Sequence, residues 1–461
     1  MSSRTVSRRS FLKGAGLAAT TVAAGGGSVL VPAFAADAPG WQNWSGNQQA
    51  NPAAVLYPRD EADLVQAVKS ARGPIRAFGG SHSFSALVPT DGTLLSLEQM
   101  TGLIDHDPAT HRATLGGGTR IAIASELLNS IGQHFENEPD INLQSVAGAI
   151  STSTHGTGMT LRAMSGYVTQ LKLVLADGSV VTCSAERDRE LFDAARVSMG
   201  CLGIISEATF QNRAAYRLAE DTKVMDLADA MAFIDRQRNI DRHVEIFVFP
   251  FGGKAMVQQM NITADAETPA VDSTFDKNEL VRLASEAVRL APVTKGMIQK
   301  LVGAFVEETR RVAPAHRMFP NVRTVQFNEM EYTVPAEQGL ACLQEVVDVI
   351  RARDFPVFFP IEYRYTAADD TAVGMFAGQA GASISVHQYH KQDYRELFNA
   401  IEPVFRKYRG RPHWGKLHTM GAKDLRAVYP RLDEFLAVRR RVDPEGRFLN
   451  PYLRHMLGVS V

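Results

Sequence analysis

The sequence predicts an α+β fold made of two domains. At 461 residues and 45% apolar content, the chain can bury a large core and exceeds what one core usually serves. Up to about residue 215, short apolar strand patterns and helical patterns interleave without a regular strand–helix–strand repeat. From about residue 216, longer helical patterns alternate with apolar strands. We therefore place a domain boundary near residue 215.

Individual elements follow from periodicity and turn signals. Residues 61–71 predict a helix, because Leu64, Val65 and Val68 share one helical face. Residues 171–175 and 180–182 predict a hairpin, because Asp177-Gly178-Ser179 between them is a turn signal. The other predicted strands are 75–78, 93–97, 112–115 and 243–249, and the other predicted helices are 121–131, 278–290 and 335–353.

Charge and cysteine content exclude several classes of function. Lys and Arg number 49 against 50 Asp and Glu, and no basic block occurs beyond the first residues. No electrostatic footprint for nucleic acid is present, so a small, weakly charged partner fits better. Cys183, Cys201 and Cys342 match neither a disulfide framework nor a metal site and are predicted to be buried thiols. The histidines show no ligand spacing either, so no metal site is predicted.

The N-terminal segment predicts export. Residues 7–13, SRRSFLK, form a twin-arginine pattern, and an A-x-A cleavage signal follows at 33–35. Three glycines at 25–27 interrupt the apolar stretch between them, which makes it a poor membrane-spanning helix. We predict a signal peptide at residues 1–35 and a location in the periplasm or cell envelope. Its removal takes away four basic residues and no acidic one, changing the formal charge from −1 to −5. Export of this type commonly serves proteins that fold around a cofactor in the cytoplasm.

Two loops suit the phosphates of a dinucleotide. Residues 76–85, RAFGGSHSFS, and 145–158, SVAGAISTSTHGTG, combine small residues that expose backbone N–H groups with hydroxyls that donate to anionic oxygens. A Rossmann fingerprint is missing, since Gly116-Gly117-Gly118 lacks the third spaced glycine. Either loop taken alone is more simply explained as a tight turn than as a phosphate-binding loop. The two loops together, behind an export signal, indicate a dinucleotide.

These loops belong to a set of motifs that resembles a known family. Trp41-x-x-Trp44, the histidine loop, the second loop ending His155-Gly-Thr-Gly, and residues 199–208 resemble the FAD-binding domain of vanillyl-alcohol-oxidase-type (PCMH) flavoproteins. Residues 361–364 (IEYR), 411–416 (RPHWGK) and 443–452 resemble motifs of the sugar-1,4-lactone oxidases within that group. The likeness covers nearly the whole mature chain. It implies a two-subdomain FAD-binding domain at 45–215, a substrate domain with a large antiparallel sheet at 216–445, and a closing segment at 446–461.

The resemblance also implies the residues that hold FAD. His82 takes the place of a histidine that is bonded to the 8-methyl carbon of the flavin, so FAD is expected to be covalently attached through His82. Relatives often have glycine immediately before this histidine, where this chain has Ser81. The implied cofactor-binding residues are Arg76, Gly79, Gly80, Ser81, His82, Ser83, Ala149, Thr154, His155, Thr157, Ile205, His413 and Lys416.

Glu362, Arg364 and Lys416 are the predicted catalytic residues. Glu362 and Arg364 alternate along one predicted strand, so their side chains share a face. The apolar run 355–361 before them predicts a buried strand. Burying a charged pair costs desolvation free energy, so such a pair in a buried strand indicates a function. A carboxylate beside a guanidinium suits a polyhydroxylated substrate. The resemblance implies that Lys416 lies beside the flavin. His418 is a further candidate base. Glu329 and Glu331 could also reach the pocket, but the favoured expectation is that one faces solvent and the other structures its strand.

The resemblance implies oxidation of an alcohol group of a sugar-1,4-lactone, with hydride passing to the flavin. Oxygen, a cytochrome or a quinone are the candidate electron acceptors, and peripheral association with a membrane is an open alternative. Alditol oxidation is the alternative within the same class. Ala149 stands where alditol oxidases carry a serine, which argues against it. A protein that binds flavin or carbohydrate without turnover is the alternative from another class.

Overall fold

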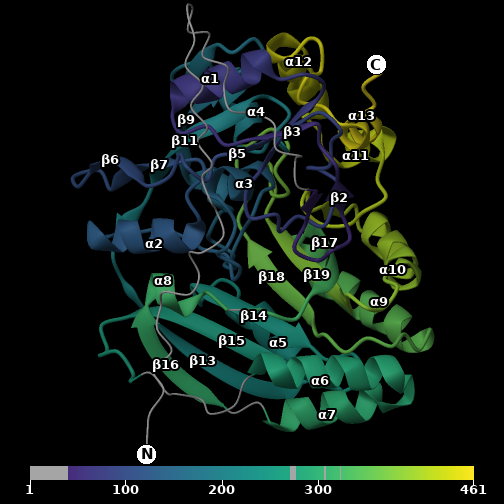
Figure 1. Cartoon of the computed structure of the whole chain (residues 1–461). Helices are drawn as coiled ribbons and strands as arrows, with labels where there is room; N and C mark the ends of the chain where they lie inside the picture. The colour runs from purple at the N-terminus through teal and green to yellow at the C-terminus, as the bar shows by residue number, and fades with distance from the viewer. Residues whose placement is uncertain (1–39, 270–276, 306–307, 322, 461) are drawn as a thin grey trace, which may run out of the picture. The chain divides into compact units, whose positions relative to one another are not determined.

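The strands form two groups that divide near residue 215. A three-stranded parallel sheet, a five-stranded antiparallel sheet and two small ribbons take their strands from residues 41–214. An eight-stranded antiparallel sheet takes its strands from residues 217–412. Figure 1 shows the first group in purple to blue and the second in teal to green, with helices packed around both. The predicted α+β class and the large antiparallel sheet are confirmed.

The computed structural model describes residues 40–269, 277–305, 308–321 and 323–460. Two units divide the chain, residues 1–37 and 38–461, and the predicted signal peptide lies outside the described residues. None of the described helices has the length and apolar character needed to cross a membrane.

The α-helices are α1 Glu61–Ser70, α2 Ile121–Ser130, α3 Val146–Ser151, α4 Arg189–Ala195, α5 Leu227–Gln237, α6 Lys277–Leu290, α7 Lys295–Phe305, α8 Ala315–Met318, α9 Gly339–Ala352, α10 Arg395–Lys407, α11 Ala422–Val428, α12 Leu432–Val442 and α13 Pro451–Leu457. The strands are β1 Trp41–Gln42, β2 Gln49–Ala50, β3 Ala54–Leu56, β4 Ile75–Phe78, β5 Thr93–Ser96, β6 Leu103–Asp107, β7 Arg112–Gly116, β8 Gln133–His134, β9 Val168–Val174, β10 Val180–Ser184, β11 Ile204–Gln211, β12 Arg213–Ala214, β13 Arg217–Asp226, β14 His243–Val248, β15 Lys254–Thr263, β16 Thr309–Pro314, β17 Phe327–Pro335, β18 Ile361–Thr366, β19 Gly381–Tyr389 and β20 Arg411–Pro412.

Local signals in the first part give the elements that they predict. The Asp60 side chain caps α1 by accepting a hydrogen bond from the Asp63 backbone N–H at 2.8 Å, and Leu64 and Val68 bury its apolar face. Strands β9 and β10 pair antiparallel from Val174 and Val180 outward, so the predicted hairpin is confirmed. The three cysteines are free and buried, as predicted.

The eight-stranded sheet has one apolar and one polar face. Because side chains alternate along a strand, Met330, Tyr332 and Val334 of β17 share a face with Tyr363 of β18 and Ile384 of β19. Helices α5, α9 and α10 pack against the sheet, and the helices and this face contribute to one continuous hydrophobic core. The opposite face carries Glu329, Glu331, Glu362, Arg364 and His387, all buried. A buried sheet face with this many charges is unusual and marks a functional surface.

Residues 446–450 pack into the N-terminal part of the chain. Phe448 is fully buried in a core cluster with Leu64, Val68 and Ile75. The Arg447 guanidinium donates to the backbone carbonyls of Val68 and Ala71, at 2.8 and 3.2 Å. The last part of the chain therefore completes the core around α1 and β4.

One predicted strand is wrong in its extent. Residues 355–360 have no regular secondary structure, and β18 begins only at Ile361. The cause is Pro356 and Pro360, which cannot donate to a sheet ladder. Phe355, Val357, Phe358 and Phe359 are nevertheless buried, so the apolar run signals burial correctly.

Candidate active site

Two cavities adjoin where the first part of the chain meets the eight-stranded sheet. The first, here called the loop cavity, has about 1020 Å³ of free space and is lined mainly by residues 76–83, 117–118, 144–152 and 199–205. The second, the sheet cavity, has about 690 Å³ and is lined by the polar face of the sheet together with His413 and Lys416. Four residues line both cavities: His82, Ser83, Gln144 and Thr152. A ligand filling both cavities would pass His82.

The loop cavity is built from closely packed backbone. A Cβ atom at Gly79 would overlap the Ser145 side chain, and one at Gly117 or Gly118 would overlap a backbone carbonyl of β11 or of Leu97. Only glycine lets these segments approach so closely, which leaves a wall of main chain and small side chains. Such a wall fits an extended dinucleotide, whose phosphates are bound through backbone N–H groups. The residues present therefore fit the predicted FAD.

Contacts with neighbouring residues fix the conformation of the histidine loop. Ser81 has a left-handed backbone conformation with φ of 56°, and its Oγ accepts a hydrogen bond from Trp41 Nε1 at 3.0 Å. The Trp44 ring stacks against the His82 ring, with centroids 5.5 Å apart. Burial, with the cations of Lys416 and Arg120, lowers the pKa of His82 to about 4. The ring is therefore neutral at pH 7.

Most of the predicted cofactor-binding residues line one of the cavities. Arg76, Gly79, Gly80, Ser81, His82, Ser83 and Ile205 line the loop cavity, and Thr154, His155, His413 and Lys416 line the sheet cavity. Arg76 donates to the backbone carbonyls of Leu87, Met199, Gly200 and Phe448. Its guanidinium thus joins distant segments at the cavity wall, and burial lowers its pKa to about 10.

Ala149 and Thr157 line neither cavity. In α3 the residues that line the loop cavity are Ala147, Gly148 and Ser151, while Ala149 lies on the opposite face and is fully buried in the core. The Thr157 hydroxyl donates to the carbonyl of Val244 at 2.8 Å. Both residues therefore pack behind the cavity walls and line neither cavity. Their predicted contacts with FAD stay predictions.

Residues 413–416 form a turn that delivers two side chains to the sheet cavity. Trp414 is fully buried, and its Nε1 donates to the Val373 carbonyl at 2.8 Å. The backbone N–H of His413 donates to the Glu331 carbonyl at 3.0 Å, which fixes the turn against β17. The histidine loop docks on the same turn, because Ser85 Oγ donates to the Trp414 carbonyl at 2.6 Å. This turn thereby brings Lys416 and the His82 loop together.

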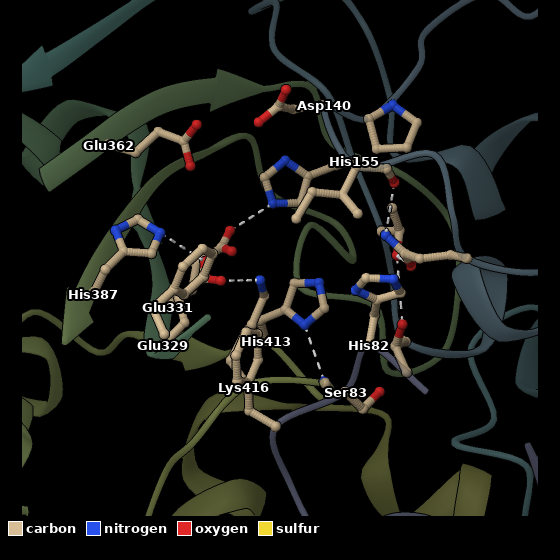
Figure 2. A pocket seen from close by; sticks show the side chains of 18 of the residues that line it. His82, Ser83, Asp140, His155, Glu329, Glu331, Glu362, His387, His413 and Lys416 are labelled. Carbon is tan, nitrogen blue, oxygen red and sulfur yellow. Dashed lines mark hydrogen bonds and ion pairs between the residues drawn. The ribbon is translucent and has the colours of Figure 1, made fainter. Parts of the chain in front are cut away.

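The sheet cavity holds a network of opposite charges (Figure 2). Lys416 Nζ forms an ion pair with Glu329, and Arg364 lies 3.4 Å from both Glu331 and Glu362. His155 Nε2 lies 2.7 Å from Glu331 Oε1. The predicted sharing of one face by Glu362 and Arg364 is confirmed. The expectation that Glu329 or Glu331 faces solvent is wrong, because both are buried and line the cavity.

Neighbouring cations keep these buried carboxylates ionised. Burial alone would raise the pKa of Glu329 and of Glu331. The Lys416 ammonium outweighs burial at Glu329 and the Arg364 guanidinium outweighs it at Glu331, so both pKa values lie well below the ordinary range. Glu245 on β14 behaves oppositely, since burial and the charge of Glu362 raise its pKa to about 8.

His387 faces the sheet cavity and was missed in the sequence. It lies on β19, where Ser383, Ser385 and His387 alternate with apolar residues, a period-two pattern that could have indicated it. Its Nε2 is 3.6 Å from Glu329 Oε1, and its Nδ1 is 3.2 Å from the Pro360 carbonyl oxygen. Figure 2 shows His387 beside Glu329, with His82 on the other side of the cavity. Asp140 and Arg323, which pair at the same cavity, come from irregular segments that carry no sequence signal.

His418, the candidate base from the sequence, does not line either cavity. It is packed against Trp414, and its Nε2 lies 3.3 Å from the Tyr452 hydroxyl. Burial lowers the pKa of His418 to about 4. This interpretation is therefore corrected, since the ring borders neither cavity in which a substrate could bind.

Glu329, Glu362 and His387 place three ligand atoms within 4.8 Å of one another, as a metal site requires. The ion pairs of Lys416 with Glu329 and of Arg364 with Glu362 already compensate both carboxylates. A metal cation there would meet two positive side chains at close range. The absence of a metal site thus stays a prediction.

A cavity that fits a dinucleotide meets a cavity of paired charges, as a flavin-dependent oxidoreductase requires, and comparison with known proteins identifies that class. Residues 52–184 match an FAD binding domain model, and residues 208–456 match the D-arabinono-1,4-lactone oxidase model. The chain belongs to the D-arabinono-1,4-lactone oxidase family. Its cofactor is FAD, and it is an FAD-dependent oxidoreductase acting on CH–OH groups.

Similar proteins extend over the same length of chain. The L-gulono-1,4-lactone dehydrogenase of Mycobacterium tuberculosis is 35% identical over 91% of this chain and 99% of its own. The L-gulonolactone oxidase of Mus musculus is 24% identical over 90% of this chain and 97% of its own. A solved cholesterol oxidase from Brevibacterium sterolicum shares the fold, with a TM-score of 0.78, 16% identity and coverage of 92% of this chain and 99% of that one.

Proposed function

We propose that this protein oxidises an alcohol carbon of a sugar-1,4-lactone. The observation that carries the proposal is the position of His82, which borders both the loop cavity and the charged sheet cavity. Bound FAD would accept two electrons as a hydride from the substrate carbon. The names of the relatives from Mycobacterium tuberculosis and Mus musculus support a lactone as the substrate.

Glu362, Arg364 and Lys416 are the proposed substrate-binding and catalytic groups. The Glu362 carboxylate can accept hydrogen bonds from sugar hydroxyls, and the Arg364 guanidinium can donate to a ring or carbonyl oxygen. Lys416 holds positive charge next to Glu329 and close to His82, and would stabilise negative charge on FAD when the cofactor is bound and reduced. Together these groups orient a neutral, hydroxyl-rich molecule.

His387 is the proposed acceptor of the substrate hydroxyl proton. The Pro360 carbonyl can only accept a hydrogen bond, so the His387 Nδ1 beside it carries a proton, and Nε2 is the ring nitrogen left to exchange a proton with the substrate. Nε2 faces Glu329 inside the sheet cavity, where this carboxylate would stabilise the imidazolium that forms. The arrangement supports a Glu329–His387 pair as the base.

His82 is the proposed covalent tether of FAD. Its low pKa and its place between the cavities support a neutral ring held against the flavin. Acid precipitation of the purified protein should leave the yellow colour in the pellet, whereas a His82→Ala variant should release it to the supernatant. A colourless wild-type pellet would contradict the bond and leave the oxidation reaction untouched.

Export through the twin-arginine route to the periplasm or envelope is part of the proposal, on the basis of residues 7–13 and 33–35. Oxygen, a cytochrome or a quinone is the proposed acceptor, and peripheral membrane association would bring a quinone within reach. Fusion of residues 1–35 to a reporter that is active only after folded export would test the location.

An anaerobic screen for flavin bleaching tests the reaction. Aldonolactones should bleach the bound flavin faster than polyols, and oxygen, cytochrome c and a quinone analogue added afterwards should reveal the acceptor. Glu362→Gln and Arg364→Met should slow bleaching by about 10²-fold or more. Tyr363→Phe is the matched control, because Tyr363 lies between them on the opposite face. Equal bleaching by wild type and both site variants would exclude this pocket.

The base assignment has its own signature. His387→Gln should slow bleaching by about 10²- to 10⁴-fold near neutral pH, and the loss should shrink as the pH rises and the substrate hydroxyl ionises more readily. His390→Gln, outside both cavities, is the control. A pH-independent loss in His387→Gln would instead indicate a structural role.

A further inference from the structure

A tight turn between β1 and β2 packs against the histidine loop. It comprises residues 43–48 and is here called the Asn43 turn. The buried Asn43 side chain closes it, because Oδ1 accepts a hydrogen bond from the Gln48 N–H at 3.0 Å and Nδ2 donates to Asn47 Oδ1 at 2.6 Å. These bonds within the turn give it a fixed shape of its own.

The Asn43 turn holds the main chain on both sides of His82. The backbone N–H of Trp44 donates to the Ser81 carbonyl at 2.8 Å, and Asn43 Nδ2 donates to the Ser83 carbonyl at 2.9 Å. Both bonds fix the backbone around His82, but neither restricts rotation about the bonds of its side chain. The orientation of the imidazole therefore depends on what the ring itself contacts.

The ring of His82 stacks on the ring of Trp44. The ring centroids are 5.5 Å apart, and the two planes differ by 28°. None of the described residues forms a hydrogen bond with a ring nitrogen of His82. A hydrogen-bonding partner would occupy a nitrogen that is needed for a bond to the flavin. Stacking instead restricts the orientation of the ring and leaves both nitrogens unpaired.

Trp44 is itself held in place by the histidine loop and by the sheet. Phe84 of the loop and Phe327 of β17 meet its ring edge-on, with centroids 6.4 and 5.1 Å away. Gln326 Nε2 donates to the Trp44 carbonyl. Since Phe327 also lines the sheet cavity, these contacts tie the orientation of the His82 ring to the wall of that cavity.

We propose that Trp44 is a positioning residue for the attachment of FAD to His82. The proposal rests on the proposed covalent tether. Attachment joins a nitrogen of the imidazole to the 8-methyl carbon and removes one hydrogen from each partner. These two protons and two electrons convert oxygen, the acceptor, to hydrogen peroxide. Trp44 takes no part in the bond change, and it acts by limiting the rotation of the His82 ring before the bond forms.

The rate of covalent attachment tests the proposal. The full chain is produced in riboflavin-starved cells and mixed with FAD in air, and the flavin that stays in the pellet after acid precipitation is measured over time. Trp44→Leu should lower the attachment rate at saturating FAD at least about tenfold. The FAD concentration that gives half of the maximal rate should change less than about threefold, because the walls of the loop cavity stay intact.

Two further variants separate positioning from packing. Trp44→Phe keeps an aromatic face, so its attachment rate should lie between those of wild type and Trp44→Leu. Phe358→Leu is the matched control, because Phe358 belongs to the same aromatic cluster as Trp44 but lines neither cavity. Phe358→Leu should lower the melting temperature at least as much as Trp44→Leu and attach FAD at the wild-type rate.

A purely structural role for Trp44 predicts a different result. In that case the half-saturating FAD concentration would rise and the rate at saturating FAD would return to the wild-type value. That pattern would overturn the proposal, as would Trp44→Leu attaching FAD as fast as wild type or Phe358→Leu attaching it as slowly as Trp44→Leu. In each of these results wild type still attaches FAD, so the tether stands. Wild type without flavin in the pellet would overturn the tether and this proposal together.

Discussion

Ser81 combines a strained backbone with a compensating hydrogen bond. A left-handed conformation costs a non-glycine residue on the order of 1 kcal/mol, and the bond from Trp41 recovers about as much. Ser81→Gly should therefore change the melting temperature little, since it removes both. Ser81→Ala keeps the strain and loses the bond, so it should destabilise the protein by about 1–2 kcal/mol. Thermal melts of the two variants check this, and equal destabilisation would contradict the balance.

His418 makes the protein sensitive to acid without touching the substrate. Burial lowers its pKa in the folded state to about 4, below the value of about 6.5 in an unfolded chain. The neutral ring therefore contributes its full stability above about pH 6.5, and that contribution is lost as the pH falls toward 4. Between pH 7 and pH 5 the loss is about 2 kcal/mol.

A His418→Gln variant should remove part of this sensitivity, because glutamine can still bond Tyr452 but does not titrate. The measurement is the drop in melting temperature from pH 7 to pH 5, which should be smaller in the variant than in wild type. An identical drop in both would assign the acid sensitivity to other groups.

At the scale of elements, neighbouring residues of β17 have different roles, one in stability and one in the reaction, because they face opposite sides of the sheet. Met330 faces the apolar core and Glu331 faces the sheet cavity. Met330→Ala should lower the free energy of unfolding by about 2–5 kcal/mol and leave KM for the substrate nearly unchanged. Glu331→Gln should slow flavin bleaching at least about tenfold, since Arg364 and His155 lose their shared anion. Both variants losing only stability would show that Glu331 has no part in the reaction.

Periodicity predicted the elements better than it predicted their pairing. Helix α1 and strand β4 follow from local patterns, and the alternation in β18 placed Glu362 and Arg364 on one face. The prolines at 356 and 360 limit that strand, an effect that apolar content alone hides. His387 was missed because its role depends on lying next to Glu329, and the pairing of β17 with β19 joins segments far apart in sequence. The family resemblance supplied Lys416, whose position is set by the buried Trp414.

At the scale of the whole molecule, the C-terminal segment stabilises the cofactor half. Phe448 is fully buried beside α1 and β4, so Phe448→Ala should cost about 3–5 kcal/mol and lower FAD retention although residue 448 lines neither cavity. Tyr57→Ala, an exposed residue of the same half, is the control. Flavin content per chain and melting temperature check this. Full retention of FAD with normal stability in Phe448→Ala would contradict it.

The bonds between Arg76 and the end of the chain also restrict when the protein can become complete. Arg76 Nη1 donates to the carbonyl of Phe448, 372 positions later, and Arg447 donates to Val68, 379 positions earlier. A ribosome delivers Phe448 long after Arg76, so the growing chain exposes an unfinished pocket until that later segment has been made. Stable loading of the prosthetic group must then wait until the segment around residue 448 has emerged and packed beside Arg76.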